Sequence, residues 1–348
     1  MIISLKKICI FILIFIYSSN CLGLAISKQS SQESTQNSEE ETAQKANSQI
    51  LPRQILKTGI NLKIPYISPN SRQLADQIGL TPLLIKIENL RKIRLDDKIT
   101  LENLSKRQDL YETVQKALVL VTKTNFEIDF TLAEIGAEEV VYGEILNTFT
   151  AERDKMVARS NAMSFYSNGV LWAVGEAFDI PTNRYPNLSV PSGILGIIAG
   201  LAPSAFSLYA MHQYNGKKRT SEVEPNMLAK IFGYKINPTI EYPDSVWNFL
   251  NSKQANTNAK LDRKDVLINR WVSDSNISSF TDRNSSKQLD AITASVSEKK
   301  ALNIQTLTAR QEMLKQLSAE IYKMKRMLLE LTMVINGEKE LTSLETSN

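Results

Sequence analysis

Residues 190–211 read VPSGILGIIAGLAPSAFSLYAM, and no formally charged residue occurs between Arg184 and Lys217. A helix needs about 20 apolar residues to cross the hydrocarbon core of a bilayer, so this stretch is long enough to do so. A helix that is apolar all round is also typical of a buried core helix. The stretch therefore predicts either a membrane span or an apolar helix enclosed by protein.

Small residues recur along one face of this predicted helix. Gly196 and Gly200 form a G-x-x-x-G pair, and Ser204 continues the four-residue spacing. Such a face lets a second helix backbone approach closely, which is how many membrane helices pack. We therefore expect Gly196, Gly200 and Ser204 to be helix-packing residues.

A second apolar piece, residues 162–178, precedes the first and contains Glu176 near its end. The two pieces are able to form a helical hairpin with its tip at residues 179–187. The excess of basic residues at 217–219 favours instead a single span with that end inside, because cytoplasmic flanks are enriched in Lys and Arg. One membrane span, a membrane hairpin and a soluble hairpin packed through glycine all remain open.

Long amphipathic helices are predicted on both sides of this segment. Residues 101–165 lack proline, and apolar residues follow one helix face at steps of three, four or seven. These residues are Ile128, Leu132, Ile135, Tyr142, Leu146, Phe149 and Met156. The pattern predicts one long helix, or two with a break near residues 122–125.

The C-terminal region, residues 286–337, carries the most regular repeat. A heptad seam runs from Leu307 to Ile335 with Arg310 as its one polar break, and Gly337 supplies a C-terminal stop. We expect a coiled-coil helix whose seam includes Leu314, Leu317, Ile321, Met324, Leu328 and Leu331. Its partner is either another helix of this chain or a helix of another chain. Residues 338–348 form a tail.

The N-terminus resembles an export signal. Lys6 and Lys7 precede an apolar run of about ten residues, and small residues allow cleavage after Ala25. Retention as an anchor and lipidation at Cys21 are the alternatives. Residues 26–50 are polar and predict a disordered linker, because they bury too little apolar surface to offset chain entropy.

The predicted fold class is mainly α, with long amphipathic helices flanking a central apolar Gly/Ala-rich helical hairpin or membrane span, and a C-terminal coiled coil. The predicted order is a signal at 1–25, the linker, a helical domain at 51–161, the apolar segment at 162–212, a loop-rich connector at 213–285, and the C-terminal helix. Within the connector, residues 262–273 predict a short helix that buries Leu267, Ile268, Trp271 and Val272.

The residue inventory limits the chemistry. The chain has one His and two Cys in 348 residues, and both cysteines, Cys9 and Cys21, lie in the signal segment. We therefore expect no cofactor, no metal site and no enzymatic activity. His212 is expected to be interfacial rather than catalytic. Carboxylates able to act as an acid–base pair are Glu127, Asp129, Glu138, Glu139 and Asp179, although a solvated helix face is the more ordinary role for them.

The charge balance argues against nucleic acid as a partner. The net charge is +4, and removing Lys6 and Lys7 with the signal leaves 39 basic against 37 acidic residues, or about +2. The expected function is that of an exported, membrane-associated helical scaffold or interaction protein of the membrane or cell envelope. It would act through helix–helix association with a protein partner or itself. The alternative is a membrane-inserting or pore-forming helical-hairpin protein.

Overall fold

The computed structural model describes residues 56–93, 100–212, 216, 218–220, 224–235, 240–255, 260–296 and 302–341. All of them belong to the unit Arg53–Asn348. The predicted signal and linker, residues 1–50, and tail residues 342–348 lie outside the described residues. The described part of the chain contains helices, three isolated bridge pairs and no strand, which confirms the prediction of a mainly α fold.

The α-helices, in chain order, are α3 (Pro69–Gln77), α4 (Thr81–Lys92), α5 (Leu101–Asp179), α6 (Ser189–His212), α7 (Met227–Phe232), α8 (Asp244–Leu250), α9 (Arg263–Ser273), α10 (Ser286–Ile292) and α11 (Ile304–Asn336). Short 3-10 turns, η1 (Ile180–Asn183) and η2 (Pro186–Leu188), connect α5 to α6, and η3 (Ser275–Ile277) follows α9.

Helix α5 is a single helix of 79 residues. The Thr100 side chain caps its N-terminus by accepting a hydrogen bond from the Asn103 N–H. The helix runs without interruption through residues 122–125, so the alternative of two helices is wrong. It also continues through residue 161, where the sequence suggested a domain boundary. Its end is followed by Pro181, which lies at the start of η1.

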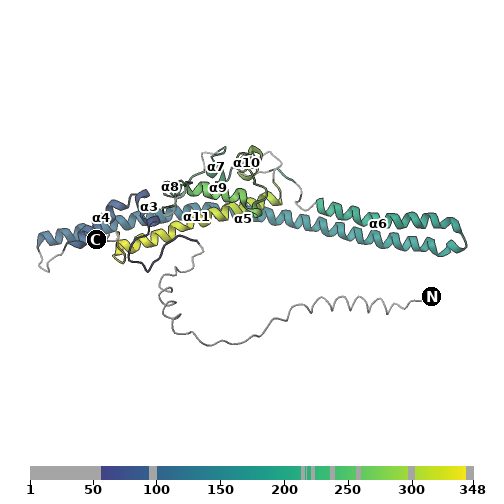
Figure 1. Ribbon diagram of the computed structural model, residues 1–348, viewed down its shortest axis with the longest axis horizontal. Coiled ribbons are helices and arrows are strands. Elements are labelled where there is room, and N and C mark those ends of the chain that lie inside the picture. Colours follow the sequence, from purple (N-terminus) through teal and green to yellow (C-terminus); the bar gives the residue numbers. More distant parts are fainter. Residues whose placement is uncertain are drawn as a thin grey trace, which may run out of the picture. The chain divides into compact units, whose positions relative to one another are not determined.

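Helix α11 lies antiparallel against the N-terminal half of α5 (Figure 1). The Gln311 side chain donates to the Glu139 carbonyl at 3.1 Å, and further along α11 Lys325 pairs with Asp129 at 2.6 Å. Residue numbers thus rise along α11 as they fall along α5. Ile128, Ile135, Tyr142 and Phe149 of the predicted α5 face are buried in the resulting core, while Leu132 and Leu146 pack at its edge. Phe149 is the last α5 residue in that core.

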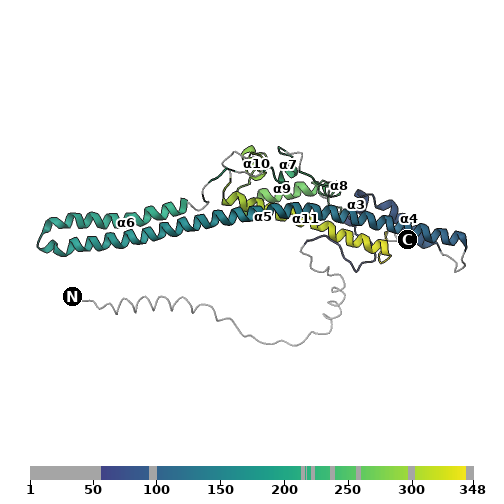
Figure 2. The ribbon, with the colours of Figure 1, turned by 180° about the vertical axis from the view of Figure 1, so that it is seen from behind.

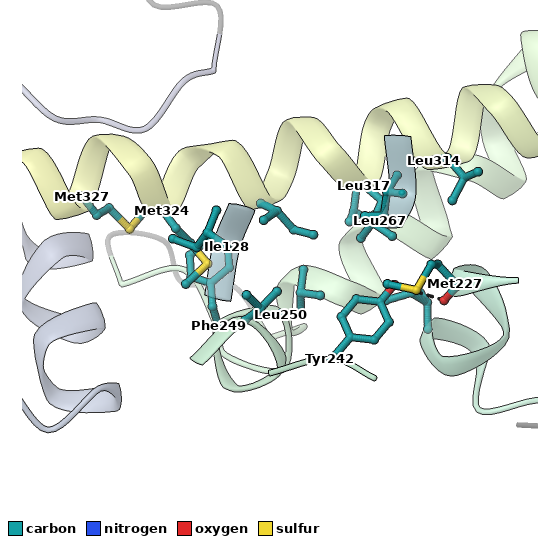
Figure 3. Packing of buried hydrophobic residues seen from close by; sticks show 14 of the residues in the cluster. Ile128, Met227, Tyr242, Phe249, Leu250, Leu267, Leu314, Leu317, Met324 and Met327 are labelled. Atoms are coloured by element: carbon teal, nitrogen blue, oxygen red, sulfur yellow. Dashed lines mark hydrogen bonds between the residues drawn. The ribbon is translucent and has the colours of Figure 1, made fainter. Parts of the chain in front are cut away.

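The predicted seam of α11 is buried within this chain. Leu314, Leu317, Ile321, Met324, Leu328 and Leu331 are all 0–4% exposed. Figure 3 shows members of the seam next to Ile128 of α5, Leu267 of α9 and side chains of α8. Because α5 and the shorter helices already cover it, the seam offers no free surface to a helix of another chain while this core is closed.

Arg310, the polar break in that seam, is also fully buried. Its Nε and Nη2 groups donate to the Ala291 carbonyl at 2.9 and 2.5 Å, and its guanidinium lies 5.2 Å from the centre of the Tyr142 ring. Two hydrogen bonds and a cation–π contact therefore compensate part of the cost of burying this charge. The break is part of the core rather than an exposed position.

Shorter helices complete the core. The predicted helix at 262–273 is present as α9, which buries Leu267, Ile268 and Trp271 and half-buries Val272. The connector also contains α7 and α8, which the sequence did not predict. The region 286–337 holds two separate helices, α10 and α11, and Ala294 between them has a positive φ of 55°. Gly337 ends α11 in the left-handed conformation, as predicted.

A buried ion pair joins the end of α11 to the segment before α3. Lys339 and Glu330 are each 1% exposed at the side chain, with Nζ and Oε1 2.5 Å apart. Lys339 also donates to the carbonyls of Asn61 and Tyr66, and Glu330 accepts from the Ser68 hydroxyl. The pair is therefore hydrogen-bonded on both sides, as a buried charge pair requires.

Candidate functional site: an apolar two-helix arm

Residues 160–212 form a feature separate from the core, which we refer to as the arm; the other described residues form the body. The arm consists of the C-terminal part of α5 and the whole of α6, which lie side by side in both ribbon views (Figures 1 and 2). The Ser160 hydroxyl donates to the Phe206 carbonyl at 3.0 Å, and the Ser192 hydroxyl donates to the Gly175 carbonyl at 3.2 Å. These bonds fix one antiparallel register along the arm.

Small residues line the contact between the two arm helices. Within the arm the buried residues are Ser160 and Gly175 of α5 and Ala199 of α6. A Cβ atom placed on Gly175 would meet the Leu195 Cβ at 3.8 Å, which shows how closely the helices approach there. Small side chains at the contact allow this approach.

Most of the arm's large apolar side chains lie outside that contact and are exposed. Many of the arm's aromatic and branched residues are exposed, among them Phe165, Tyr166, Val170, Trp172, Val190, Ile194, Ile197, Leu201 and Leu208. The apolar helical segment Pro186–His212 is long enough to span a membrane. Of its most apolar stretch of 18 residues, only 6% is buried within the chain. A water-soluble helix pair buries its large apolar residues and exposes its polar ones. The arm has the opposite arrangement.

Within the arm, formally charged residues occur only near its tip, at Glu176, Asp179 and Arg184, and Arg159 stands just before its base. On α5 no Asp, Glu, Lys or Arg occurs between Arg159 and Glu176, and α6 contains none along its whole length. The sixteen residues between those two α5 charges span about 24 Å at 1.5 Å per residue. The charge-free length is therefore close to the thickness of a bilayer's hydrocarbon core, about 30 Å.

The predicted packing residues lie on α6 but not at the contact with α5. A Cβ atom on Gly196 or Gly200 would meet nothing within 4 Å, and Ser204 is exposed and donates to the Gly200 carbonyl. Their role as packing residues stays a prediction that involves a second molecule. The amino-acid sequence alone did not predict that Ser160, Gly175 and Ala199 lie at this contact. The signal that marks the α5 side is a row of mostly small residues, at positions 160, 164, 167, 171 and 175.

Among the candidate carboxylates, Glu138 has the most unusual surroundings. It lies on α5 half-buried beneath α7, and its two oxygens accept the Met227 N–H at 2.9 and 3.2 Å. Burial raises the pKa of Glu138 to about 7, against the lowering effects of the Met227 hydrogen bond and of nearby Arg310. Tyr142 accepts a hydrogen bond from Asn226 beside it. This cluster holds α5, α7 and α11 together.

The other candidate carboxylates are not brought together. Asp129 pairs with Lys325, Glu127 lies 3.6 Å from Lys123, and Asp179 ends α5 at the far end of the arm. Burial also raises the pKa of Glu139, which does not share the Met227 contact of Glu138. No group of three potential metal ligands is found among the described residues. His212 is exposed at the last position of α6.

An open groove of about 840 Å³ lies between α5, the end of α3 and α8. Its rim carries both signs of charge, including Lys123, Glu127, Lys230 and Glu241. Two of these opposite charges, Lys123 and Glu127, lie 3.6 Å apart, so the rim presents no single sign of charge to a ligand. The arm is therefore the feature with the clearest chemical character. Comparison of the chain with protein-family models, curated proteins and solved structures finds no match.

Proposed function

We propose that this protein is a membrane-associated helical interaction protein whose arm inserts into a bilayer as a hairpin of two helices. The observation that carries the proposal is the arrangement of the arm, with small residues such as Gly175 and Ala199 inside and large apolar residues such as Leu201 outside. In water such a surface is unfavourable by about 25 cal/mol per Å² of exposed apolar area. In lipid the same surface is the stable one.

The shared core supports two crossings over one. Ile128 and Ile135, before the arm, pack in the same cluster as Trp271 and Leu314, after it. A single crossing by α6 would put these two sets on opposite sides of the membrane and break the core. Two crossings return the chain to the side on which it began, so the body stays intact in water.

Orientation follows from the basic residues beside the arm. With two crossings, Arg153, Lys155 and Arg159 lie on the same side as Arg219, which is the side of the body. If the N-terminus is an export signal, this is the outer side, contrary to the positive-inside rule for helices inserted during synthesis. We therefore propose that the chain is exported to the envelope, folds, and then inserts its arm from outside.

A charge placed in the middle of the arm tests insertion. Leu201 is 64% exposed, so Leu201→Asp leaves the body's core untouched. An Asp at the centre of a membrane helix costs about 2.5–3.5 kcal/mol, which predicts roughly 100-fold weaker partition into vesicles. The matched control is Leu101→Asp, which changes an exposed leucine at the other end of α5.

Vesicle flotation of the purified full chain measures the partition, and quenching of tryptophan fluorescence by brominated lipids reports depth. We expect quenching of Trp172, which is 53% exposed in the arm, and no quenching of Trp271, which is buried in the body. A Trp172→Phe variant identifies the quenched residue. The proposal is contradicted if the wild-type chain does not float, or if both aspartate variants float equally well.

The open glycine face supports a second role, self-association of inserted arms. Gly196 and Gly200 have open space before them and are exposed to lipid in the proposed arrangement. Gly200→Leu should then abolish crosslinked oligomers in vesicles, whereas Gly169→Leu, an equally open glycine on α5, should not. Release of a trapped dye from the same vesicles tests for a pore. Oligomers that survive Gly200→Leu would reject this face.

A further inference from the structure

The base of the arm contains a small pocket with a basic rim. Its volume is about 240 Å³, and it is lined by Phe149, Glu152, Arg153, Lys155, Met156, Gly216 and Arg219. The pocket lies where the chain leaving α6 returns to α5, at the junction of arm and body. Phe149 and Met156 supply an apolar wall, and charged groups surround the opening.

The arginines of this pocket are held in place by acidic neighbours. The Arg219 guanidinium donates to both Glu152 oxygens at 2.5 and 2.7 Å and lies 5.0 Å from the centre of the Phe149 ring. Arg153 pairs with Asp154 at 2.8 Å. Glu152 and Asp154 each neutralise one arginine, so they offset part of the positive charge at the opening.

Three further basic residues near the base of the arm are not paired with a carboxylate among the described residues. Lys155, Arg159 and Lys218 are exposed and have no ion-pair partner among the described residues. With the two arginines, five basic side chains stand against Glu152 and Asp154, a local net charge of +3. The chain as a whole carries only +4, so positive charge is concentrated at the base of the arm.

The depth of insertion places this charge at the lipid headgroups. A hydrocarbon core of about 30 Å takes about 20 helical residues, which from Gly175 reach back to Met156. Arg159 then lies just inside the edge, where a long side chain extends outward to the interface. Arg153 and Lys155 lie at the headgroup level. At the other end, Glu176 lies at the opposite interface.

We infer that the pocket between Phe149, Met156 and Arg219 binds the phosphate of an anionic phospholipid headgroup, with Lys155 and Arg159 drawing such lipids to it. The inference rests on insertion of the arm. Basic pockets at the ends of membrane helices bind anionic headgroups in this way, and each Lys or Arg near the surface strengthens binding to anionic membranes by about fivefold. The pocket thus gives the protein a preference for anionic over zwitterionic membranes.

The test compares partition of the full chain into vesicles of phosphatidylcholine alone and into vesicles containing phosphatidylglycerol. The ratio of the two partition coefficients measures the preference. Lys155→Gln with Arg159→Gln should lower this ratio about 25-fold and leave binding to phosphatidylcholine unchanged. The matched control is Arg107→Gln with Lys116→Gln, which removes the same charges from exposed positions of α5 in the body.

Two further measurements separate the pocket from general attraction. Met156→Trp fills the pocket and keeps every charge, so it should also lower the ratio. Glycerol 3-phosphate in solution, at matched ionic strength, should leave the ratio unchanged, because the site takes a headgroup held at the bilayer surface.

Several results overturn the inference. They are a wild-type ratio near one, an equal fall in the control, a normal ratio in Met156→Trp, or loss of the preference with glycerol 3-phosphate, which would assign the pocket to soluble phosphate esters. Wild-type binding to phosphatidylcholine with a ratio near one rejects the pocket alone. Failure to bind either vesicle rejects insertion of the arm and the pocket together.

Discussion

The body and the arm share helix α5 but treat apolar residues in opposite ways. In the body, Ile128 and Ile135 face α11 and are fully buried, as is Leu317 on α11 itself. In the arm, the contact between α5 and α6 buries Ser160, Gly175 and Ala199, while Ile197 and Leu201 are 65% and 64% exposed. Helix α5 thus passes from a seam of large apolar residues, which ends at Phe149, to a contact of small residues, which begins about three turns later at Ser160.

The difference shows what a helix needs in each surrounding. In water, burial of large apolar side chains drives the helices together, so the seam must be apolar and the outside polar. In lipid there is no such driving force, and helices associate through close contact of small residues and hydrogen bonds. The hydroxyl-to-carbonyl bonds of Ser160 and Ser192 are contacts of the kind that the proposed insertion of the arm requires.

The largest predicted effect concerns the buried ion pair of the body. The arm contains no such contact, since it carries no charge between Arg159 and Glu176. Lys339→Met would leave the buried Glu330 carboxylate without its cation. We expect a loss of about 3–5 kcal/mol in the free energy of unfolding, measured by urea denaturation. The double variant Lys339→Met with Glu330→Met should recover much of this loss. A loss below about 1 kcal/mol in the single variant would mean that the pair is open to solvent.

A matched pair of leucine truncations tests the comparison directly. Leu317→Ala should cost about 2–5 kcal/mol in the free energy of unfolding, because it leaves a cavity between α11 and its neighbours. Leu201→Ala should cost close to nothing in water and should weaken partition into vesicles. Urea denaturation and vesicle flotation of both variants measure the two quantities. Equal destabilisation in water would mean that the arm is part of a packed core.

Much of the body was predictable because its helices repeat a simple pattern. Steps of three, four and seven residues identified the buried face of α5 through Ile128, Ile135 and Tyr142, and the seam of α11 through Leu314 and its successors. Gly337 correctly marked the end of α11. These signals are local, since each depends only on residues within one helix.

The features that were missed depend on contacts between distant segments. Helices α7 and α8 have only 6 and 7 residues, too few to show a period, and they form because the core covers one face of each. Arg310 looked like a polar interruption of the seam because its partners are remote in sequence. The Ala291 carbonyl accepts its hydrogen bonds, and the Tyr142 ring lies beside its guanidinium. In the arm, the sequence predicted packing through Gly196 and Gly200, which stays a prediction, and did not point to Ser160 and Gly175, because small residues do not reveal which helix they face.

The smallest expected effect concerns Glu138, a half-buried carboxylate of the body. The charge-free stretch of the arm, residues 160–175, has no counterpart to it. Burial raises its pKa to about 7 from 4.5, so the folded chain holds a proton that the unfolded chain releases between those pH values. Stability from this group is therefore greatest below pH 4.5 and is lost as the pH rises to about 7. The full shift corresponds to about 3 kcal/mol, and partial exposure reduces the expected loss to about 2 kcal/mol.

Glu138→Gln isolates this effect because the amide oxygen still accepts the Met227 N–H but has no proton to lose. Urea denaturation between pH 4.5 and 8 should show a shallower fall in stability for this variant than for the wild type. Burial also raises the pKa of Glu139, which contributes a slope of the same sign to both proteins and cancels in their difference. Glu112→Gln, which removes an exposed carboxylate of α5, should retain the wild-type slope. An unchanged slope in Glu138→Gln would mean that α7 does not cover this carboxylate as it does in the structure.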